Sequence, residues 1–81
     1  MKLSVYLFGP AREAAGTGRA TVTVGAEPTV ANLLTALATA HPGLEALLAR
    51  SRVAVNHVYA DAAESIAAED EIAVIPPVGG G

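Results

Sequence analysis

The chain has 81 residues, 16% of them charged, and a formal net charge of −3, so it can form one small domain and has no basic stripe for binding nucleic acid. It contains no cysteine, which excludes disulfides, thiolate catalysis and zinc ribbons. No apolar run approaches the roughly 20 residues that span a bilayer, and the N-terminus does not resemble a signal peptide, so we expect a cytoplasmic protein without a membrane partner.

The first half of the chain predicts two strands followed by a helix. Residues 2–8 and 19–24 both alternate between apolar and polar side chains, and the short connection between them favours an antiparallel pair. After a Gly-Pro break, residues 11–15 can form a helical turn within that connection. Thr29 is expected to cap a long helix whose buried face follows the spacing i, i+3, i+4 and i+7. This face consists of Val30, Leu33, Leu34 and Leu37.

The second half predicts further strands and only short helical pieces. In chain order we expect a helical piece at 44–48, a strand at 52–55, a turn at Asn56-His57, a short strand at 58–59, a loop or short helix at 61–70 and a last strand at 71–75. The earlier helix is then the one long amphipathic element available to cover the strands. The predicted fold class is α+β, with a mixed sheet of four to five strands packed on one main helix.

The body of the chain shows no pattern that indicates catalysis. The Gly-Thr-Gly stretch at 16–18 lacks the third glycine of a dinucleotide-binding loop and the lysine of a phosphate-binding loop. His41 and His57 have no partners at a metal-site spacing, so no metal is expected. The acidic run at 69–71 is interpreted as a solvated loop. Mild acidity favours docking onto a basic partner surface, and Arg12 is the body residue that we expect to contact a partner.

The last six residues, 76–81, differ in composition from everything before them. Two prolines end the last strand and favour an extended segment, because proline cannot donate to a sheet ladder. A single valine can occupy a partner pocket, and three glycines can enter a channel too narrow for other residues. The segment that we expect to insert into a partner consists of Pro76, Pro77, Val78, Gly79 and Gly80.

The one unusual chemical group of the chain is the α-carboxylate of Gly81. Fully extended, the tail reaches roughly 20 Å beyond the fold, so this carboxylate can enter a deep active site of another protein. We therefore divide the chain into a body at 1–75 and a flexible C-terminal tail at 76–81. A free carboxylate is a poor electrophile, but activation by ATP as an acyl-adenylate would let a sulfur nucleophile replace AMP and leave a thiocarboxylate. The chain is then a substrate and carrier, not an enzyme on its own.

Four segments together resemble the small, sulfur-carrier subunit of molybdopterin synthase, within the ubiquitin-like β-grasp sulfur carriers. The resemblance begins with LSVYLFGPARE at 3–13 and continues through PTVANLLTAL at 28–37. It is strongest in VAVNHVYA at 53–60 and EDEIAVIPPVGGG at 69–81. The family ends the last segment with an acidic turn, an apolar strand and PPV-x-GG, and here Gly79 fills the x position.

The resemblance implies a specific cycle and specific partners. An E1-like, ATP-using enzyme would adenylate Gly81, and a sulfur donor system would convert it to the thiocarboxylate, so no cofactor is bound by this chain. The tail would then insert into the large catalytic subunit of a heterotetramer. There it would donate sulfur to precursor Z, cyclic pyranopterin monophosphate, in molybdenum cofactor biosynthesis. Apolar sheet residues would supply the docking surface, with Phe8 and Val78 as candidate contacts beside Arg12.

Several alternatives share these features. A related carrier that serves thiamine thiazole synthesis or tRNA thiolation has the same fold and tail. A ubiquitin-like modifier would join Gly81 to lysines of other proteins. A plain interaction domain with a frayed tail would need no terminal glycine at all.

Overall fold

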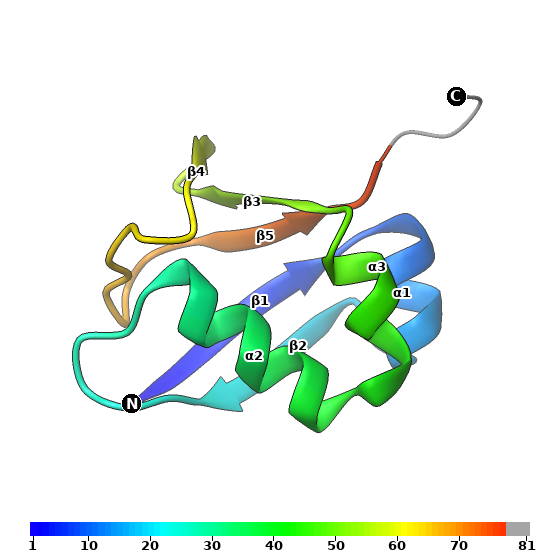
Figure 1. Ribbon diagram of the computed structural model, residues 1–81, viewed down its shortest axis with the longest axis horizontal. Helices are drawn as coiled ribbons and strands as arrows, with labels where there is room; N and C mark the ends of the chain where they lie inside the picture. Colours follow the sequence, from blue (N-terminus) through cyan, green and yellow to red (C-terminus); the bar gives the residue numbers. More distant parts are fainter. Residues whose placement is uncertain (78–81) are drawn as a thin grey trace.

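The computed structural model describes residues 1–77 and shows a five-stranded sheet with one long helix lying across it (Figure 1). The strands are β1 (Lys2–Leu7), β2 (Arg19–Thr23), β3 (Arg52–Val55), β4 (Val58–Ala60) and β5 (Ile72–Ile75). The helical elements are α1 (Gly9–Ala15), α2 (Val30–Ala40), a 3-10 turn η1 (Pro42–Leu44) and α3 (Glu45–Leu48). The strand order is β2-β1-β5-β3-β4, in which β1 and β5 are parallel and the other pairs antiparallel. The sheet is therefore mixed, and its first two strands form an antiparallel pair, as predicted.

The core lies between the sheet and α2 because one face of each is apolar. In β1 and β5 every second side chain is buried on the helix side, as the alternation predicts. These buried strand residues are Leu3, Val5, Leu7, Ile72 and Val74. The helix contributes the buried residues Val30, Leu33 and Leu37, while Leu34 is only partly buried at the edge of the core.

The start of α2 is fixed by two reciprocal hydrogen bonds around Thr29. The Asn32 N–H donates to Thr29 Oγ1 (3.3 Å), and the Thr29 N–H donates to Asn32 Oδ1 (2.8 Å), which is a capping box. The Val30 and Ala31 N–H groups, which follow Thr29, donate to backbone carbonyls of the loop between β4 and β5. The predicted N-cap is thus confirmed, and the long loop satisfies donors that the helix itself leaves free.

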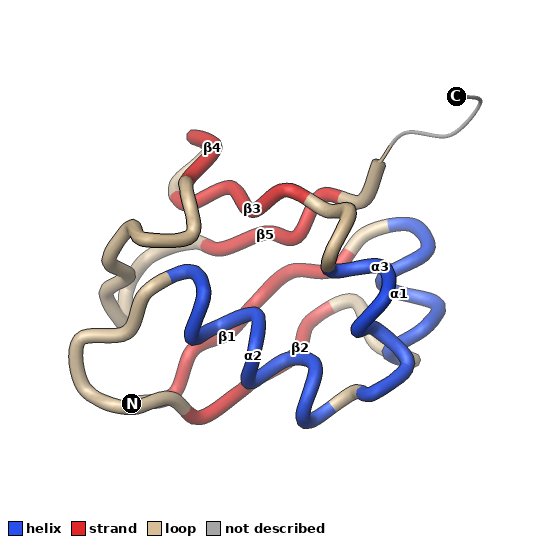
Figure 2. The backbone as a smooth tube through the Cα atoms, in the orientation of Figure 1, coloured by secondary structure: helices blue, strands red, loops and turns tan. Residues whose placement is uncertain are grey.

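The segment 61–71 between β4 and β5 carries no helix, so of the two options predicted there the loop is correct (Figure 2). Its Ile66 is buried, with 4% of its surface exposed, and the Ile66 N–H donates to the Pro28 carbonyl (2.9 Å). A short bridge between Ser65 and Thr29 ties the same loop to the start of α2. A lone apolar residue in a polar segment has no periodicity, which is why the sequence pattern does not reveal this burial.

Element ends differ slightly from the predicted ones. α1 begins at Gly9, two residues earlier than expected, because Pro10 fits the first helical turn, where no N–H is needed. β1 ends at Leu7, and β5 begins at Ile72. The helical piece predicted at 44–48 is present as α3 with the 3-10 turn before it.

The predicted turn at Asn56-His57 is confirmed and connects β3 to β4. Val55 and Val58 are in register, so the loop between them has only these two residues. Both have positive φ, 52° for Asn56 and 69° for His57, which is the backbone of the primed turns that match strand twist.

Candidate functional site

The parallel pairing of β1 and β5 brings the end of β1 next to the start of the tail (Figure 1). Leu7 is in register with Val74, so both strands leave the sheet at the same end. Pro76 is buried there, and a side chain placed on Gly9 would come within 3.9 Å of Pro76 Cγ. Pro77 is exposed. We call the short segment Pro76-Pro77 the tail root.

The structure describes only the tail root of the predicted insertion segment. The remaining tail residues are Val78, Gly79, Gly80 and Gly81, and they lie outside the described residues. Their roles in pocket filling, insertion and adenylation stay predictions.

On the sheet face that points away from α2, two small side chains form an apolar floor, and larger side chains surround it. Ala54 of β3 and Ala73 of β5 are in register, so their methyl groups lie side by side on this face. Phe8, Tyr59 and Ile75 stand around this floor and help enclose a hollow of ≈ 340 Å³. We call this space the alanine hollow, and one of its lining residues, Ile75, directly precedes the tail root.

The two aromatic rings of the alanine hollow are half exposed. Phe8 is 50% exposed and Tyr59 is 53% exposed. Phe8 has extended backbone (φ −124°, ψ 155°), so it keeps the alternation of β1 and directs its ring to the open face. Tyr59 lies on the edge strand β4 opposite Ala54. Exposed aromatic side chains around an apolar hollow are typical of a protein docking surface.

A second hollow of ≈ 350 Å³ surrounds the tail root and adjoins the first, because both share Tyr59 and Ile75. Its other lining residues are Arg50, Arg52, Pro76 and Pro77. The Arg52 guanidinium carbon lies 3.8 Å from the centroid of the Tyr59 ring, a cation–π contact. An apolar floor, two aromatic rings and two cations thus meet where the tail begins.

Arg12, the other predicted partner contact in the body, lies elsewhere. It is exposed on α1 and packs over Gly18, since a Cβ placed on Gly18 would be 3.4 Å from Arg12 Nε. Arg12 does not line the alanine hollow, which contains Phe8. The structure therefore does not bring the two predicted contacts into one hollow, and a partner role for Arg12 stays a prediction.

Sequence analysis did not single out Tyr59, Ile75 or the arginine pair. The alternation at 71–75 indicates that Ile75 faces away from the helix, but it does not say which strand lies beside it. For Tyr59 the sequence offered one signal of an exposed aromatic side chain. The residue lies in a strand that is too short for both of its faces to be buried.

The acidic turn lies at the opposite end of β5 and is held to the β3–β4 turn. Asp70 Oδ2 accepts a hydrogen bond from the Ala67 N–H (2.8 Å), and Asp70 Oδ1 accepts one from Asn56 Nδ2 (3.0 Å). These bonds stabilise the charged carboxylate and lower the pKa of Asp70. His57 Nε2 lies 3.2 Å from a carboxylate oxygen of Glu71, at the edge of the alanine hollow.

The lowered pKa of Asp70 predicts a pH-dependent stability. The carboxylate contributes stability at pH above its ordinary pKa of 3.8, and this contribution is lost as the pH falls through the lower folded-state value. We expect Asp70→Asn to lower the unfolding midpoint near neutral pH and to make little difference once the pH lies below the lowered folded-state pKa. Thermal unfolding followed by circular dichroism across that range measures this, with Asp61→Asn as the control for loss of an exposed carboxylate. A midpoint difference independent of pH would contradict the assignment.

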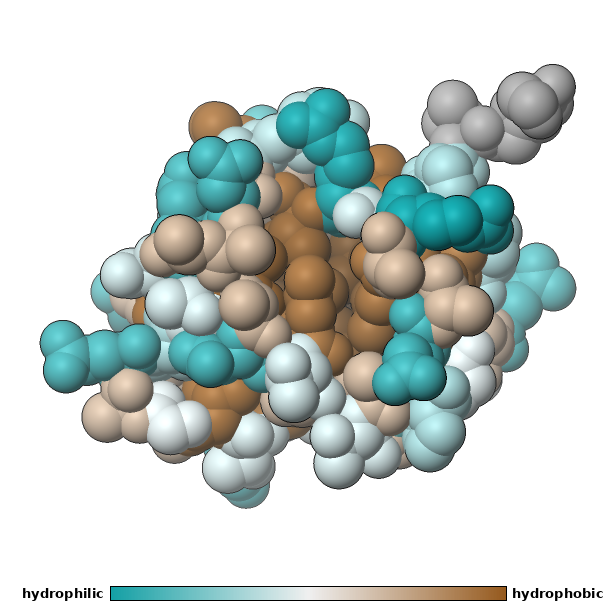
Figure 3. Space-filling model, viewed as in Figure 1, coloured by the Kyte–Doolittle hydropathy of each residue, from teal (hydrophilic) through white to brown (hydrophobic). Residues whose placement is uncertain are grey.

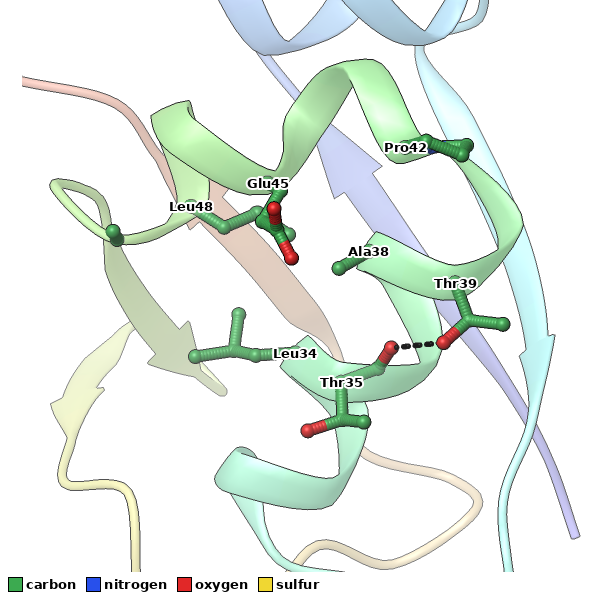
Figure 4. Close-up of a pocket in the computed structure, with 8 residues that line it drawn as sticks. Leu34, Thr35, Ala38, Thr39, Pro42, Glu45 and Leu48 are labelled. Carbon is green, nitrogen blue, oxygen red and sulfur yellow. Dashed lines mark hydrogen bonds between the residues drawn. The ribbon is translucent and has the colours of Figure 1, made fainter.

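A separate hollow of ≈ 520 Å³ lies on the helix side, between α2 and α3 (Figure 4). Leu34, Ala38 and Leu48 form its apolar wall, and Thr39 Oγ1 donates to the Thr35 carbonyl (2.9 Å) at its edge. Apolar surface gathers in a recess on this side of the molecule (Figure 3). The hollow contains none of the predicted site residues, and α2 and the sheet separate it from the alanine hollow.

The two histidines lie in different parts of the described structure. His41 caps the C-terminus of α2, whereas His57 lies in the β3–β4 turn. Within residues 1–77, no three side chains of the metal-binding types lie together in a way that could hold an ion. In the same range, no helix is long and apolar enough to cross a membrane.

The mixed sheet, the crossing helix and the tail root beside an open sheet face define a ubiquitin-like β-grasp protein. The fold matches the crystal structure of the small archaeal modifier protein SAMP1 from Haloferax volcanii with a TM-score of 0.90, at 35% sequence identity and over 100% of both chains. The family model of the ThiS family matches residues 5–81, and the chain belongs to this family. The predicted fold class is thereby confirmed.

Two relatives are similar over nearly the whole chain. The chain is 32% identical over 83 aligned residues to a protein named molybdopterin synthase sulfur carrier subunit from Chlamydomonas reinhardtii, with 100% of both chains covered. It is 39% identical to small archaeal modifier protein 1 from Haloferax volcanii, with 93% of this chain and 95% of that protein covered. The resemblance drawn from the four sequence segments is confirmed by these matches.

Proposed function

We propose that this chain is the sulfur-carrier subunit of a molybdopterin synthase, in which Gly81 carries sulfur as a thiocarboxylate. The observation that supports this most directly is the alanine hollow, because a partner that docks there holds the body at the point where the tail begins. Similarity along the whole chain to a molybdopterin synthase sulfur carrier subunit supports the same assignment.

The chemistry requires two steps on the Gly81 carboxylate. In the first, a carboxylate oxygen attacks the α-phosphorus of ATP in an E1-like enzyme, and pyrophosphate leaves with the electron pair of the broken P–O bond. In the second, a hydrosulfide-level sulfur from a donor system attacks the acyl carbon, a C–S bond forms, and AMP leaves with the electrons of the C–O bond. The carrier itself contributes no acid, base or metal to these steps.

The position of the tail root limits how far the tail can carry the sulfur. From Pro77 to Gly81 there are four residues, which reach at most about 14 Å when extended. A partner docked on Phe8 and Tyr59 therefore needs an acceptor site within that distance of the tail root. We propose that the large subunit provides this site and that cyclic pyranopterin monophosphate takes up the sulfur there.

Intact mass spectrometry of the chain purified from its native cells tests the proposal. We expect a fraction whose mass corresponds to exchange of one oxygen for sulfur, with fragmentation placing the exchange at Gly81. Reconstitution with ATP and the cognate E1-like enzyme should form the adenylate and release pyrophosphate. This reaction is the control for a carrier that has already given up its sulfur in the cell. A chain that carries no sulfur and also forms no adenylate would refute the proposal.

A second candidate function is that of a protein modifier, which the 39% identity to small archaeal modifier protein 1 favours. The same activated Gly81 would then form an isopeptide bond with a lysine amine, releasing AMP or the sulfur. Mass spectrometry of cell lysates for lysine adducts of this chain tests it. Adducts on unrelated proteins that disappear when Gly81 is deleted would support this second role. Their absence, together with sulfur transfer to the pterin, would leave the carrier role alone.

A further inference from the structure

The tail root is locally basic although the chain as a whole is acidic. Arg50 and Arg52 are both exposed and line the hollow around Pro76 and Pro77. Among residues 1–77, the one side-chain ion pair joins His57 to Glu71, so neither of these two arginines is paired with a carboxylate of the described chain. Their guanidinium groups are therefore available to a partner.

The carboxylate nearest to Arg52 in the sheet belongs to Asp61, which follows the Ala60 that pairs with Val53 and lines a hollow together with Arg52. Among residues 1–77 it forms no ion pair with Arg52, and the other acidic residues next to the sheet lie at the far end of β5. Arg52 is in register with Ile75 at the end of β5, whereas Val55 is in register with Ile72 at its start. Glu71 precedes that start, so about four strand residues, or about 13 Å, separate it from the level of Arg52. The acidic loop that precedes β5 and the arginine pair thus lie toward opposite ends of that strand.

Arg52 is also held in place. Its guanidinium carbon lies 3.8 Å from the centroid of the Tyr59 ring, a cation–π contact that restricts the positions of this side chain. A planar guanidinium can bind a carboxylate through two parallel hydrogen bonds. Arg50 lies two residues earlier in the chain and lines the same hollow.

We propose that Arg50 and Arg52 recognise carboxylates on the protein surface that surrounds the entrance for the tail. This inference rests on the proposed function, since it concerns the partner that receives the tail. The net charge of −3 predicts a basic partner overall, but the charge at the tail root predicts an acidic rim at the point of insertion. A nucleic acid fits less well, because the rest of the chain would repel its phosphates.

Association kinetics with the cognate large subunit test the arginine pair. The variant Arg50→Gln/Arg52→Gln should associate about tenfold more slowly at low salt, with a shallower salt dependence and a dissociation rate changed by less than about twofold. Arg19→Gln is the matched control, because Arg19 also lies over an aromatic ring, that of Tyr6 at 5.5 Å, but on the opposite edge strand β2. It should associate like the unmodified chain.

Cross-linking identifies the groups that the arginines meet. The only lysine of the chain is Lys2, so a Lys2→Arg/Arg50→Lys/Arg52→Lys variant confines side-chain amines to positions 50 and 52. A carbodiimide should then join these amines to Asp or Glu side chains of the large subunit. Peptide mapping should place those carboxylates around the channel that receives the tail.

Three outcomes distinguish failure of the proposed function from failure of the arginine-pair proposal. If the unmodified chain does not bind the large subunit, the proposed function fails. If it binds but the Arg50→Gln/Arg52→Gln variant keeps its association rate and salt dependence, the arginine-pair proposal alone is overturned. Arginine-dependent binding of a single-stranded oligonucleotide at the same salt, without cross-links to partner carboxylates, would also overturn it.

Discussion

Deletion of Gly81 is expected to abolish sulfur transfer while leaving the fold intact. The shortened chain still ends in a glycine carboxylate, that of Gly80, but this group reaches about 3.5 Å less far from the tail root. Displacement of a reacting group by as little as about 1 Å can lower a rate about 100-fold, so we expect the loss to be at least that large. A reconstituted assay with the E1-like enzyme, a sulfur source, the large subunit and the pterin substrate measures it.

The control for this deletion is another change at a glycine of the same chain. Gly25 is exposed, and a Cβ added there meets no atom within 4 Å, so Gly25→Ala should transfer sulfur at the normal rate. The deletion variant should unfold at the same temperature as the unmodified chain, because the core residues of the described range 1–77 all remain in it. Normal transfer by the deletion variant would instead favour a plain interaction domain.

Replacement of both half-exposed aromatic residues is expected to disable docking. Phe8→Ser/Tyr59→Ser removes the two rings that enclose the alanine hollow. Truncation of aromatic anchors at interfaces costs about 2 kcal/mol or more each, so the combined change should weaken binding of the large subunit by about 1,000-fold. Titration calorimetry with the purified large subunit measures this affinity.

The matched control for the aromatic pair lies on the same edge strand. Val58 is more exposed than Tyr59, at 68%, but strand alternation places its side chain on the other face of β4. Val58→Ser should therefore bind normally. Unchanged affinity after loss of both rings, with an intact circular dichroism spectrum, would place the docking surface elsewhere and exclude the alanine hollow.

Local patterns were sufficient for most secondary-structure elements. The helical spacing of Val30, Leu33 and Leu37 and the Thr29 cap predicted α2, because periodicity and capping depend on residues within a few positions of each other. Alternation predicted β1 and β2 in the same way, and strands were also expected at the positions of β3 and β5. Alternation did not predict the burial of Ile66, which depends on the contact of its loop with the start of α2.

The features of the candidate site also fall into those that local sequence patterns predict and those that depend on the tertiary structure. The amino-acid sequence by itself determined the α+β class and the chemical group at the tail, since these depend on local periodicity and on the order of residues at the chain end. The β-grasp fold came from the resemblance of four segments to a known family. Only the tertiary structure decided that Phe8, Tyr59 and Ile75 share one hollow and that two arginines flank the tail root. Strand order and register join residues about 50 positions apart through backbone pairing, which no local period specifies.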